Sequence, residues 1–269
     1  MELGLEGKVA LVTGSSKGIG FAIAQALARE GCKVVINGRN ATYLDSAAAQ
    51  IRKAGPAGTA VHTVASDVAT PGGAERAVAE TVSHFGAIHI LVNNAGGIGR
   101  FGAFAELTDD EWLAIFQLNV MSAVRASRAA LPHMQRQKWG RIINISSESG
   151  TQPDALMPHY NASKSALNSL TKSLSKAYGA DGILVNTVSP AFIRTPLVEE
   201  MLANQAQQRG VSVDEAERAF VREFRPNIVF GRAGRPEETA GIVVFLASEQ
   251  ASFITGSNFR VDGGSVASL

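Results

Sequence analysis

The feature that most constrains the fold of this chain is a short apolar run, a glycine-rich turn and a helix in immediate succession. The run Lys8–Thr13 shows no polar alternation, which is typical of a strand buried on both faces. The glycine-rich segment 14–20, a predicted helix over 19–30 and a second buried strand over 33–37 follow it. A strand, a glycine turn, a helix and a strand within about thirty residues predict a βαβ unit.

The same alternation continues to the end of the chain. Further strands are predicted at residues 60–66, 88–92, 141–145, 183–188 and 258–262. Further helices are predicted at residues 42–54, 73–85, 109–134, 160–178 and 236–247. No linker, low-complexity tract or basic run divides the sequence. We therefore predict one α/β domain over residues 1–269, a doubly wound parallel sheet with helices on both faces.

Composition argues against several classes of function. The formal net charge is +1, which gives no electrostatic basis for binding nucleic acid or an anionic membrane. Cys32 is the single cysteine, so neither a disulfide framework nor a cysteine metal site is expected, and the five histidines show no ligand spacing. Without a signal peptide or a membrane-spanning apolar run, the protein is expected to be cytoplasmic, with no metal.

The glycine turn after the first strand predicts a phosphate site. Gly14, Gly18 and Gly20 would let the backbone approach a pyrophosphate at the N-terminus of the following helix. Their spacing, G-x-x-x-G-x-G, differs from the common G-x-G-x-x-G. The position of the turn between a strand and a helix nevertheless favours dinucleotide binding.

Two basic residues indicate which dinucleotide is bound. An NAD site usually places an acidic residue at the end of the second strand, where it holds the ribose hydroxyls. This chain has Gly38 and Arg39 there, and Lys17 lies within the glycine turn. Two cations suit a 2′-phosphate, so NADP is favoured and NAD remains possible. The alternative is that both are solvated surface charges.

Polar and glycine residues follow the ends of several predicted strands. They are Gly14, Asp67, the segment 94–96, Ser147 and Pro190. In an open α/β sheet, ligands bind in the crevice at the carboxyl ends of the strands. We therefore expect these residues to converge on one edge, where the helix of Tyr160 also begins.

Tyr160 and Lys164 are spaced for acid–base chemistry. Residues four apart lie on the same face of a helix, and an ammonium beside a phenol favours the phenolate and lowers the pKa of the tyrosine. The phenol would then exchange protons near neutral pH. The alternative is a chance spacing. His159 either lines the substrate cleft or lies on the surface at the start of the helix, and the surface position is favoured.

Together these motifs resemble the short-chain dehydrogenase/reductase family over nearly the whole chain. They are the segment Thr13–Gly20, the segment Asn93–Gly96, Ser147 thirteen residues before Tyr160, and Lys164. The resemblance is strongest to NADP-preferring members such as 3-oxoacyl-ACP reductases. It implies a Rossmann-type fold, a nicotinamide cofactor and hydride transfer between that cofactor and a carbonyl or secondary alcohol.

The resemblance also implies roles for individual residues. Tyr160 is the acid/base, Lys164 lowers its pKa, Ser147 binds the substrate oxygen, and Asn119 positions a proton-relay water. Ser146 competes for the serine role, because adjacent strand residues face opposite ways. The implied cofactor-binding residues are Gly14, Ser16, Lys17, Gly18, Ile19, Gly20, Arg39, Asp67, Val68, Asn94, Ala95, Gly96, Tyr160, Lys164, Pro190, Ile193 and Thr195.

The segment 195–231 is longer than is usual in the family and contains a polar helical stretch over 214–224. We expect a substrate lid there, with a surface excursion or an oligomer contact as alternatives. Gln152 and Phe192, with Ser147, are the candidate substrate contacts. The family also implies a homotetramer, or a dimer.

The substrate stays open. A 3-oxoacyl thioester on acyl carrier protein is one candidate, with Lys138 at one expected docking position and Asp181 where a basic residue is expected. The general alternative is a small ketone, sugar, steroid or aromatic alcohol. A non-catalytic NADP-binding regulatory protein is a further alternative, disfavoured because all four catalytic positions are filled.

Overall fold

A computed structural model describes residues 2–268, and the centre of this structure is a parallel sheet. Seven strands are found in these residues, in the order β3-β2-β1-β4-β5-β6-β7. Their bounds are β1 Val9–Val12, β2 Lys33–Gly38, β3 Val61–Ala65, β4 Ile90–Asn93, β5 Gly140–Ile145, β6 Ile183–Pro190 and β7 Asn258–Val261. Each strand pairs in parallel with its neighbours, for example with Ala10 beside Val34 on one side and Ile90 on the other. The predicted doubly wound sheet is confirmed.

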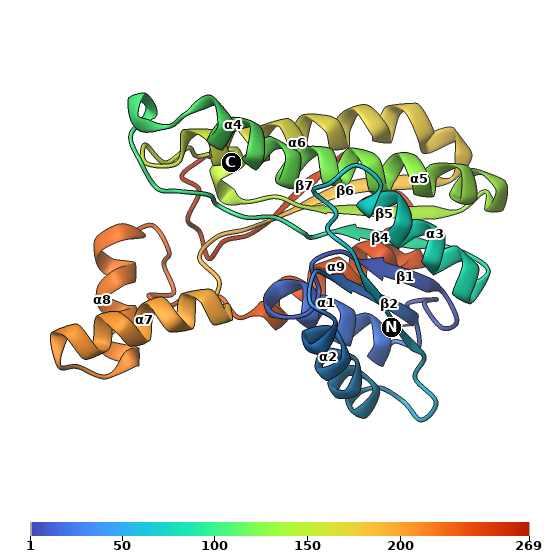
Figure 1. Ribbon diagram of the computed structural model, residues 1–269, viewed down its shortest axis with the longest axis horizontal. Coiled ribbons are helices and arrows are strands. Elements are labelled where there is room, and N and C mark those ends of the chain that lie inside the picture. The colour runs from blue at the N-terminus through green and yellow to red at the C-terminus, as the bar shows by residue number, and fades with distance from the viewer. Residues whose placement is uncertain (1, 269) are drawn as a thin grey trace.

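Helices cover both faces of the sheet (Figure 1). The α-helices are α1 Gly18–Arg29, α2 Ala41–Ala54, α3 Gly73–Phe85, α4 Asp109–Phe116, α5 Ser122–Gln137, α6 Pro158–Tyr178, α7 Pro196–Arg209, α8 Val213–Phe224 and α9 Pro236–Ala247. Helices α1, α2 and α9 pack on one face, and α3, α5 and α6 pack on the other. The pair α7 and α8 projects from this body, as the orange segment of Figure 1 shows.

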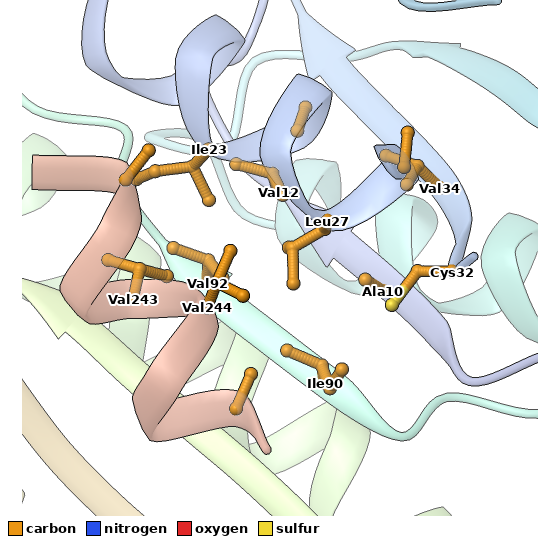
Figure 2. Packing of buried hydrophobic residues seen from close by; sticks show 14 of the residues in the cluster. Ala10, Val12, Ile23, Leu27, Cys32, Val34, Ile90, Val92, Val243 and Val244 are labelled. Atoms are coloured by element: carbon orange, nitrogen blue, oxygen red, sulfur yellow. The ribbon is translucent and has the colours of Figure 1, made fainter. Parts of the chain in front are cut away.

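The strands are mostly apolar because the two faces of the sheet are buried against helices. In β1, Ala10 and Val12 belong to the cluster formed with α1 and α9, whereas Leu11 belongs to the cluster on the opposite face. Figure 2 shows Ile23 and Leu27 of α1 beside Val243 and Val244 of α9 over these strands. Successive side chains point to opposite faces, so a strand buried on both faces carries few polar residues.

Two helical regions differ from the prediction. The helix expected over 109–134 is interrupted by a π-helical turn, η2, at Gln117–Met121. Helix α7 was not predicted at all, although Pro196 at its first turn and Gly210 just after its end are ordinary boundary signals. In the described range, no helix is both long and apolar enough to span a membrane.

Candidate active site

The sheet reverses its strand order between β1 and β4, and a cleft lies at that point. From β1 the strand order runs through β2 to β3 at one edge of the sheet, and from β4 it runs through β5 and β6 to β7 at the other edge. The connections after β1 and β4 therefore diverge. The cleft has a volume of about 580 Å³. Its predicted lining residues are Gly14, Ser16, Lys17, Gly18, Ile19, Gly20, Arg39, Asp67, Val68, Asn94, Ala95, Gly96 and Thr195. Further lining residues that the sequence did not indicate are Asn37, Gly38, Ser66, Ala69, Ala114, Leu118, Pro196 and Leu197.

The glycine turn is held close to the end of β4, without room for side chains. Gly14 has a φ of +62°, and a Cβ there would lie 2.8 Å from the Cα of Ala95. A Cβ on Gly20 would lie 2.3 Å from Nδ2 of Asn94 and 2.6 Å from the carbonyl oxygen of Gly14. Nδ2 of Asn94 donates to the carbonyl oxygens of Thr13 and Gly14, both at 2.9 Å. Asn94 therefore shapes the turn, in addition to lining the cleft.

The end of the cleft beside β2 is electropositive. Lys17 and Arg39 are exposed there, and within residues 2–268 neither forms a salt bridge with a carboxylate. At the end of β2, where an NAD site usually carries an acid, the chain has Gly38 and Arg39, and the preceding Asn37 is buried and donates to Val64 and Ser66. Helix α1 begins at Gly18, and its N-cap residue, Lys17, makes no side-chain cap hydrogen bond in the described structure. A free helix N-terminus with two unpaired cations suits a dinucleotide that carries an additional phosphate.

Asn119 and Lys164 converge behind Gly96, which lines the cleft. A Cβ on Gly96 would lie 3.1 Å from Oδ1 of Asn119 and 3.3 Å from Nζ of Lys164. Nζ of Lys164 donates to the carbonyl oxygen of Ile145, at the end of β5, at 2.9 Å. A residue larger than glycine at position 96 would displace one of the two side chains.

Asn119 lies on the π-helical turn, where one extra residue re-aims the side chains of a helix, a feature common at functional sites. Its amide donates to the carbonyl oxygen of Gly97 and to the hydroxyl of Ser163, both at 2.9 Å. Its Oδ1 accepts from the backbone N–H of Gly97 at 2.9 Å. Asn119 thus ties the loop after β4 to helix α6, and its role in positioning a water stays a prediction.

The two serines at the end of β5 face different partners. The hydroxyl of Ser146 donates to the carbonyl oxygen of Lys164 at 3.2 Å and is occupied inside the protein. Ser147 instead hydrogen-bonds to Tyr160. The geometry therefore favours Ser147 over Ser146 as the serine that faces a substrate.

The pKa of Tyr160 is shifted in the direction opposite to the one we expected. Burial raises the pKa of Tyr160 above its usual value; the hydrogen bond from Ser147 opposes this shift and the charge of Glu148 adds to it. Nζ of Lys164 lies 5.6 Å from the centre of the tyrosine ring, and burial lowers the pKa of Lys164 to about 8. Desolvation therefore outweighs the lysine, because both groups are removed from water and the ammonium is itself less stable there.

The remaining predicted contacts are not among the residues that line this cleft. Pro190 ends β6 beside Val261, and Ile193 pairs with Gly234. Phe192 stacks on Phe220 of α8, with the ring centres 4.8 Å apart. Gln152 donates to the carbonyl oxygen of Ser265 at 3.1 Å and accepts from the N–H of Ala267 at 3.0 Å. Both amide groups of Gln152 hold the C-terminal segment, and its contact with a substrate stays a prediction.

The favoured surface position of His159 is wrong. The residue is 0% exposed, and among residues 2–268 neither ring nitrogen has a hydrogen-bond partner. Its ring lies 6.0 Å from that of Trp112, in an edge arrangement. The first turn of α6 is covered by α4, a tertiary contact that a local sequence pattern does not reveal. Burial lowers the pKa of His159, because the imidazolium would lose its hydration.

We expect this buried histidine to make the protein less stable in acid. A lowered pKa means that the unfolded chain binds the proton more readily, so stability falls as the pH drops below the unfolded value of about 6.5. The variant His159→Leu should lose less stability between pH 7.5 and pH 5, by up to about 1.4 kcal/mol per pH unit for one proton. Urea unfolding at several pH values measures this difference. Parallel pH profiles of the wild type and the variant would contradict it.

Comparisons with known proteins place this fold and this site in one family. A family model described as enoyl-(acyl carrier protein) reductase matches residues 14–266. D-beta-hydroxybutyrate dehydrogenase from Cupriavidus necator is 37% identical, over 98% of this chain and 99% of its own length. A 3-oxoacyl-[acyl-carrier-protein] reductase from Aquifex aeolicus is 36% identical, also over 98% and 99%.

A solved structure agrees with these matches. L-sorbose reductase from Gluconobacter frateurii, complexed with NADPH and L-sorbose, has a TM-score of 0.93 and 38% identity over 100% of both chains. The similarity in sequence and in fold therefore covers the sheet, the cleft and the α7–α8 region together. The chain belongs to the short-chain dehydrogenase/reductase family, whose members are oxidoreductases acting on CH–OH and C=O groups.

Proposed function

We propose that this protein is an NADPH-dependent reductase that converts a small carbonyl compound into a secondary alcohol, with Tyr160 as the proton donor. One observation carries the proposal. The lining of the cleft includes two cations, Lys17 and Arg39, that form no salt bridge within residues 2–268, and it also includes Gly96. A Cβ on Gly96 would lie 3.3 Å from Nζ of Lys164, so the proposed proton-transfer residues lie next to the proposed phosphate site.

The two cations that line the cleft are the basis for assigning NADPH as the cofactor. A 2′-phosphate would lie between Lys17 and Arg39, and NAD would leave both without a partner. No carboxylate stands at the end of β2 to select for a free ribose hydroxyl, because Gly38 and Arg39 occupy that position. The binding of NADPH by L-sorbose reductase, which shares the fold, supports this choice. NAD is the weaker alternative.

The cofactor supplies the hydride when bound, and the residues of this chain manage the proton. Tyr160 donates its phenolic proton to the substrate oxygen as negative charge grows there. Ser147, already hydrogen-bonded to Tyr160, donates to the same oxygen and stabilises that charge. The raised pKa of Tyr160 keeps the phenol protonated at neutral pH, which suits donation and therefore reduction.

Lys164 and Asn119 are proposed to assist Tyr160, the proton donor. Nζ of Lys164 is fixed by the carbonyl of Ile145 and carries the nearest positive charge to the tyrosine ring, 5.6 Å from its centre. As Tyr160 loses its proton, that charge stabilises the phenolate that forms. Asn119 holds the loop of Gly97 over α6 and is proposed to position the water that returns the proton.

The substrate class is argued from the relatives and from surface charge. The relatives are named for different substrates at nearly equal sequence identity, so similarity alone does not select one substrate. An acyl carrier protein is disfavoured, because Asp181 lies at one docking position and its carboxylate is 4.0 Å from the ammonium of Lys138 at the other. A free ketone or ketose is therefore the first candidate, and a 3-oxoacyl thioester is the second.

Assembly and the lid complete the proposal. We propose that segment 195–231, which contains α7 and α8, acts as a substrate lid, since it projects from the body beside the segment leading out of β6. A homotetramer, with a dimer as the alternative, stays a prediction from the family. Sedimentation velocity measures it directly.

A carbonyl screen that follows NADPH absorbance tests the function. The panel contains ketoses, hydroxyketones, aromatic ketones and an acetoacetyl thioester, each with NADPH and with NADH. We expect oxidation of NADPH with at least one free ketone, and slower oxidation of NADH. If NADPH binds but every carbonyl in the panel is inert, the non-catalytic regulatory protein becomes the better explanation.

A further inference from the structure

A group of charged side chains joins the end of α8 to the turn that carries Ser147. Arg225 is the residue that caps the C-terminus of α8. Its Nε lies 3.8 Å from Oε1 of Glu148, and its Nη1 lies 3.3 Å from Oδ2 of Asp154. Both carboxylates belong to the segment between β5 and α6, so these ion pairs cross from the proposed lid to the body of the protein.

Glu148 is an unusual residue to bury. It is 8% exposed, and within residues 2–268 its Oε2 has no hydrogen-bond partner. Burial raises the pKa of Glu148, while Ser265 and Arg225 oppose the shift and the neighbouring Asp262 and Asp154 add to it. A buried carboxylate is costly unless it is paired. Arg225 is the cation that compensates this charge.

The two residues that carry these carboxylates also accept hydrogen bonds, at their backbone carbonyl oxygens, close to the proposed catalytic residues. Glu148 directly follows Ser147, and its carbonyl oxygen accepts from the N–H groups of Thr151 and Gln152 at 2.9 and 2.8 Å, which closes the turn. The carbonyl oxygen of Asp154 accepts from Nδ2 of Asn161, next to Tyr160, at 2.6 Å. A shift of Arg225 would therefore displace both the turn that carries Ser147 and the segment that contacts Asn161, next to Tyr160.

Other contacts tie the α7–α8 pair to the segment that follows β6: Phe220 of α8 stacks on Phe192, and Nη1 of Arg194 lies 3.1 Å from Oε2 of Glu217. Neither of these two contacts involves the turn that carries Ser147. Figure 1 shows the two helices standing away from the sheet and its covering helices. The pair Arg209–Glu223, 3.9 Å apart, joins α7 to α8 within the projection and does not reach the body. A cavity of about 110 Å³ beside Arg225, lined by Glu148, Asp154 and Asn227 among others, leaves room for the end of α8 to move.

We propose that Arg225 is a positioning residue, whose ion pairs with Glu148 and Asp154 hold the lid against the Ser147 turn. The proposal rests on the proposed reductase function, and Arg225 itself touches neither substrate nor cofactor in it. When the pairs form, as in this structure, they hold the end of α8 beside the turn that carries Ser147. When they are lost, the lid and the turn move independently.

Kinetics of four variants test the coupling. Arg225→Met removes the charge and keeps most of the side-chain length, Arg225→Lys keeps the charge, Glu148→Gln removes the other partner, and the double variant removes both. We expect Arg225→Met to lower kcat/KM about tenfold, mainly through kcat, with NADPH affinity within about twofold of the wild type. Arg225→Lys should recover most of the loss, and the double variant should be no worse than Arg225→Met.

Arg209→Met is the matched control, because it breaks an ion pair of the same helices that stays inside the projection. It should leave kcat/KM unchanged. Equal losses in Arg209→Met and Arg225→Met, or losses that simply multiply in the double variant, would overturn the proposal.

Hydrogen exchange separates failure of this proposal from failure of the proposed function. In the Arg225→Met variant we expect faster amide exchange in 213–224 and 147–152 than in the wild type or in Arg209→Met. This readout needs no turnover, so it decides the coupling even if no carbonyl in the screen is reduced. Unchanged exchange in both segments would show that Arg225 does not hold them together.

Discussion

Tyr160→Phe is expected to lower kcat by about 1,000-fold, within the range that general acid catalysis contributes. The substitution removes only the phenolic hydroxyl, which hydrogen-bonds to Ser147 and is the proposed proton donor. The ring, which belongs to α6, should stay in place. The variant should therefore keep its fold and its affinity for NADPH, because the cations and the glycine turn that are proposed to bind the cofactor are unchanged.

Single-turnover rates and NADPH fluorescence titration measure the two effects separately. Tyr178→Phe is the control, since Tyr178 ends the same helix and packs against the core far from the cleft. It should reduce carbonyl compounds at the wild-type rate. A Tyr160→Phe variant with wild-type turnover would remove Tyr160 from the mechanism.

The double variant Lys17→Ala, Arg39→Ala should weaken NADPH binding about 100-fold, because each charged hydrogen bond contributes about 1.5–3 kcal/mol and each 1.4 kcal/mol is tenfold. The affinity for NADH should change little, since NADH has no 2′-phosphate for these cations to bind. Both side chains are exposed and lie in the cleft, so the loss should come from the phosphate contact, with little effect on folding.

Lys53→Ala is the matched control for this charge change. Lys53 is an exposed cation in the last turn of α2, away from the cleft lining. Isothermal titration with both cofactors at one salt concentration compares the variants. If NADH affinity falls as much as NADPH affinity in the double variant, Lys17 and Arg39 bind a part common to both cofactors, and the NADP assignment is wrong.

The fold was predictable because its signals are local and repeated. The central strands are predominantly apolar runs because the two faces of the sheet are both covered, and the glycine turn 14–20 directly follows the first of them. The boundaries of α9 match the predicted 236–247, because Pro236 begins that helix. The π-helical turn at Asn119 escaped prediction, since its sequence continues the helical pattern and only the packing of α4, α5 and α6 favours an extra residue.

Several properties of the site cannot be predicted from the spacing of residues in the sequence. His159 reads as a surface residue at the start of a helix, but α4 covers it. Tyr160 and Lys164 lie on one face as predicted, yet the pKa shifts follow from burial, which spacing does not report. Glu148 and Arg225 are far apart in the chain, and neither belongs to a motif, so nothing local indicates their ion pair.

The sequence by itself determined the alternation of strands and helices, the glycine turn, the two cations at the cofactor end and the identities of Tyr160, Ser147 and Lys164, because these depend on residue type and short spacing. The tertiary structure decided which serine faces the tyrosine, in which direction burial shifts the tyrosine pKa, and how the α7–α8 pair is tied to the Ser147 turn. These depend on what surrounds each group in space, since desolvation and long-range ion pairs arise only when distant segments pack together.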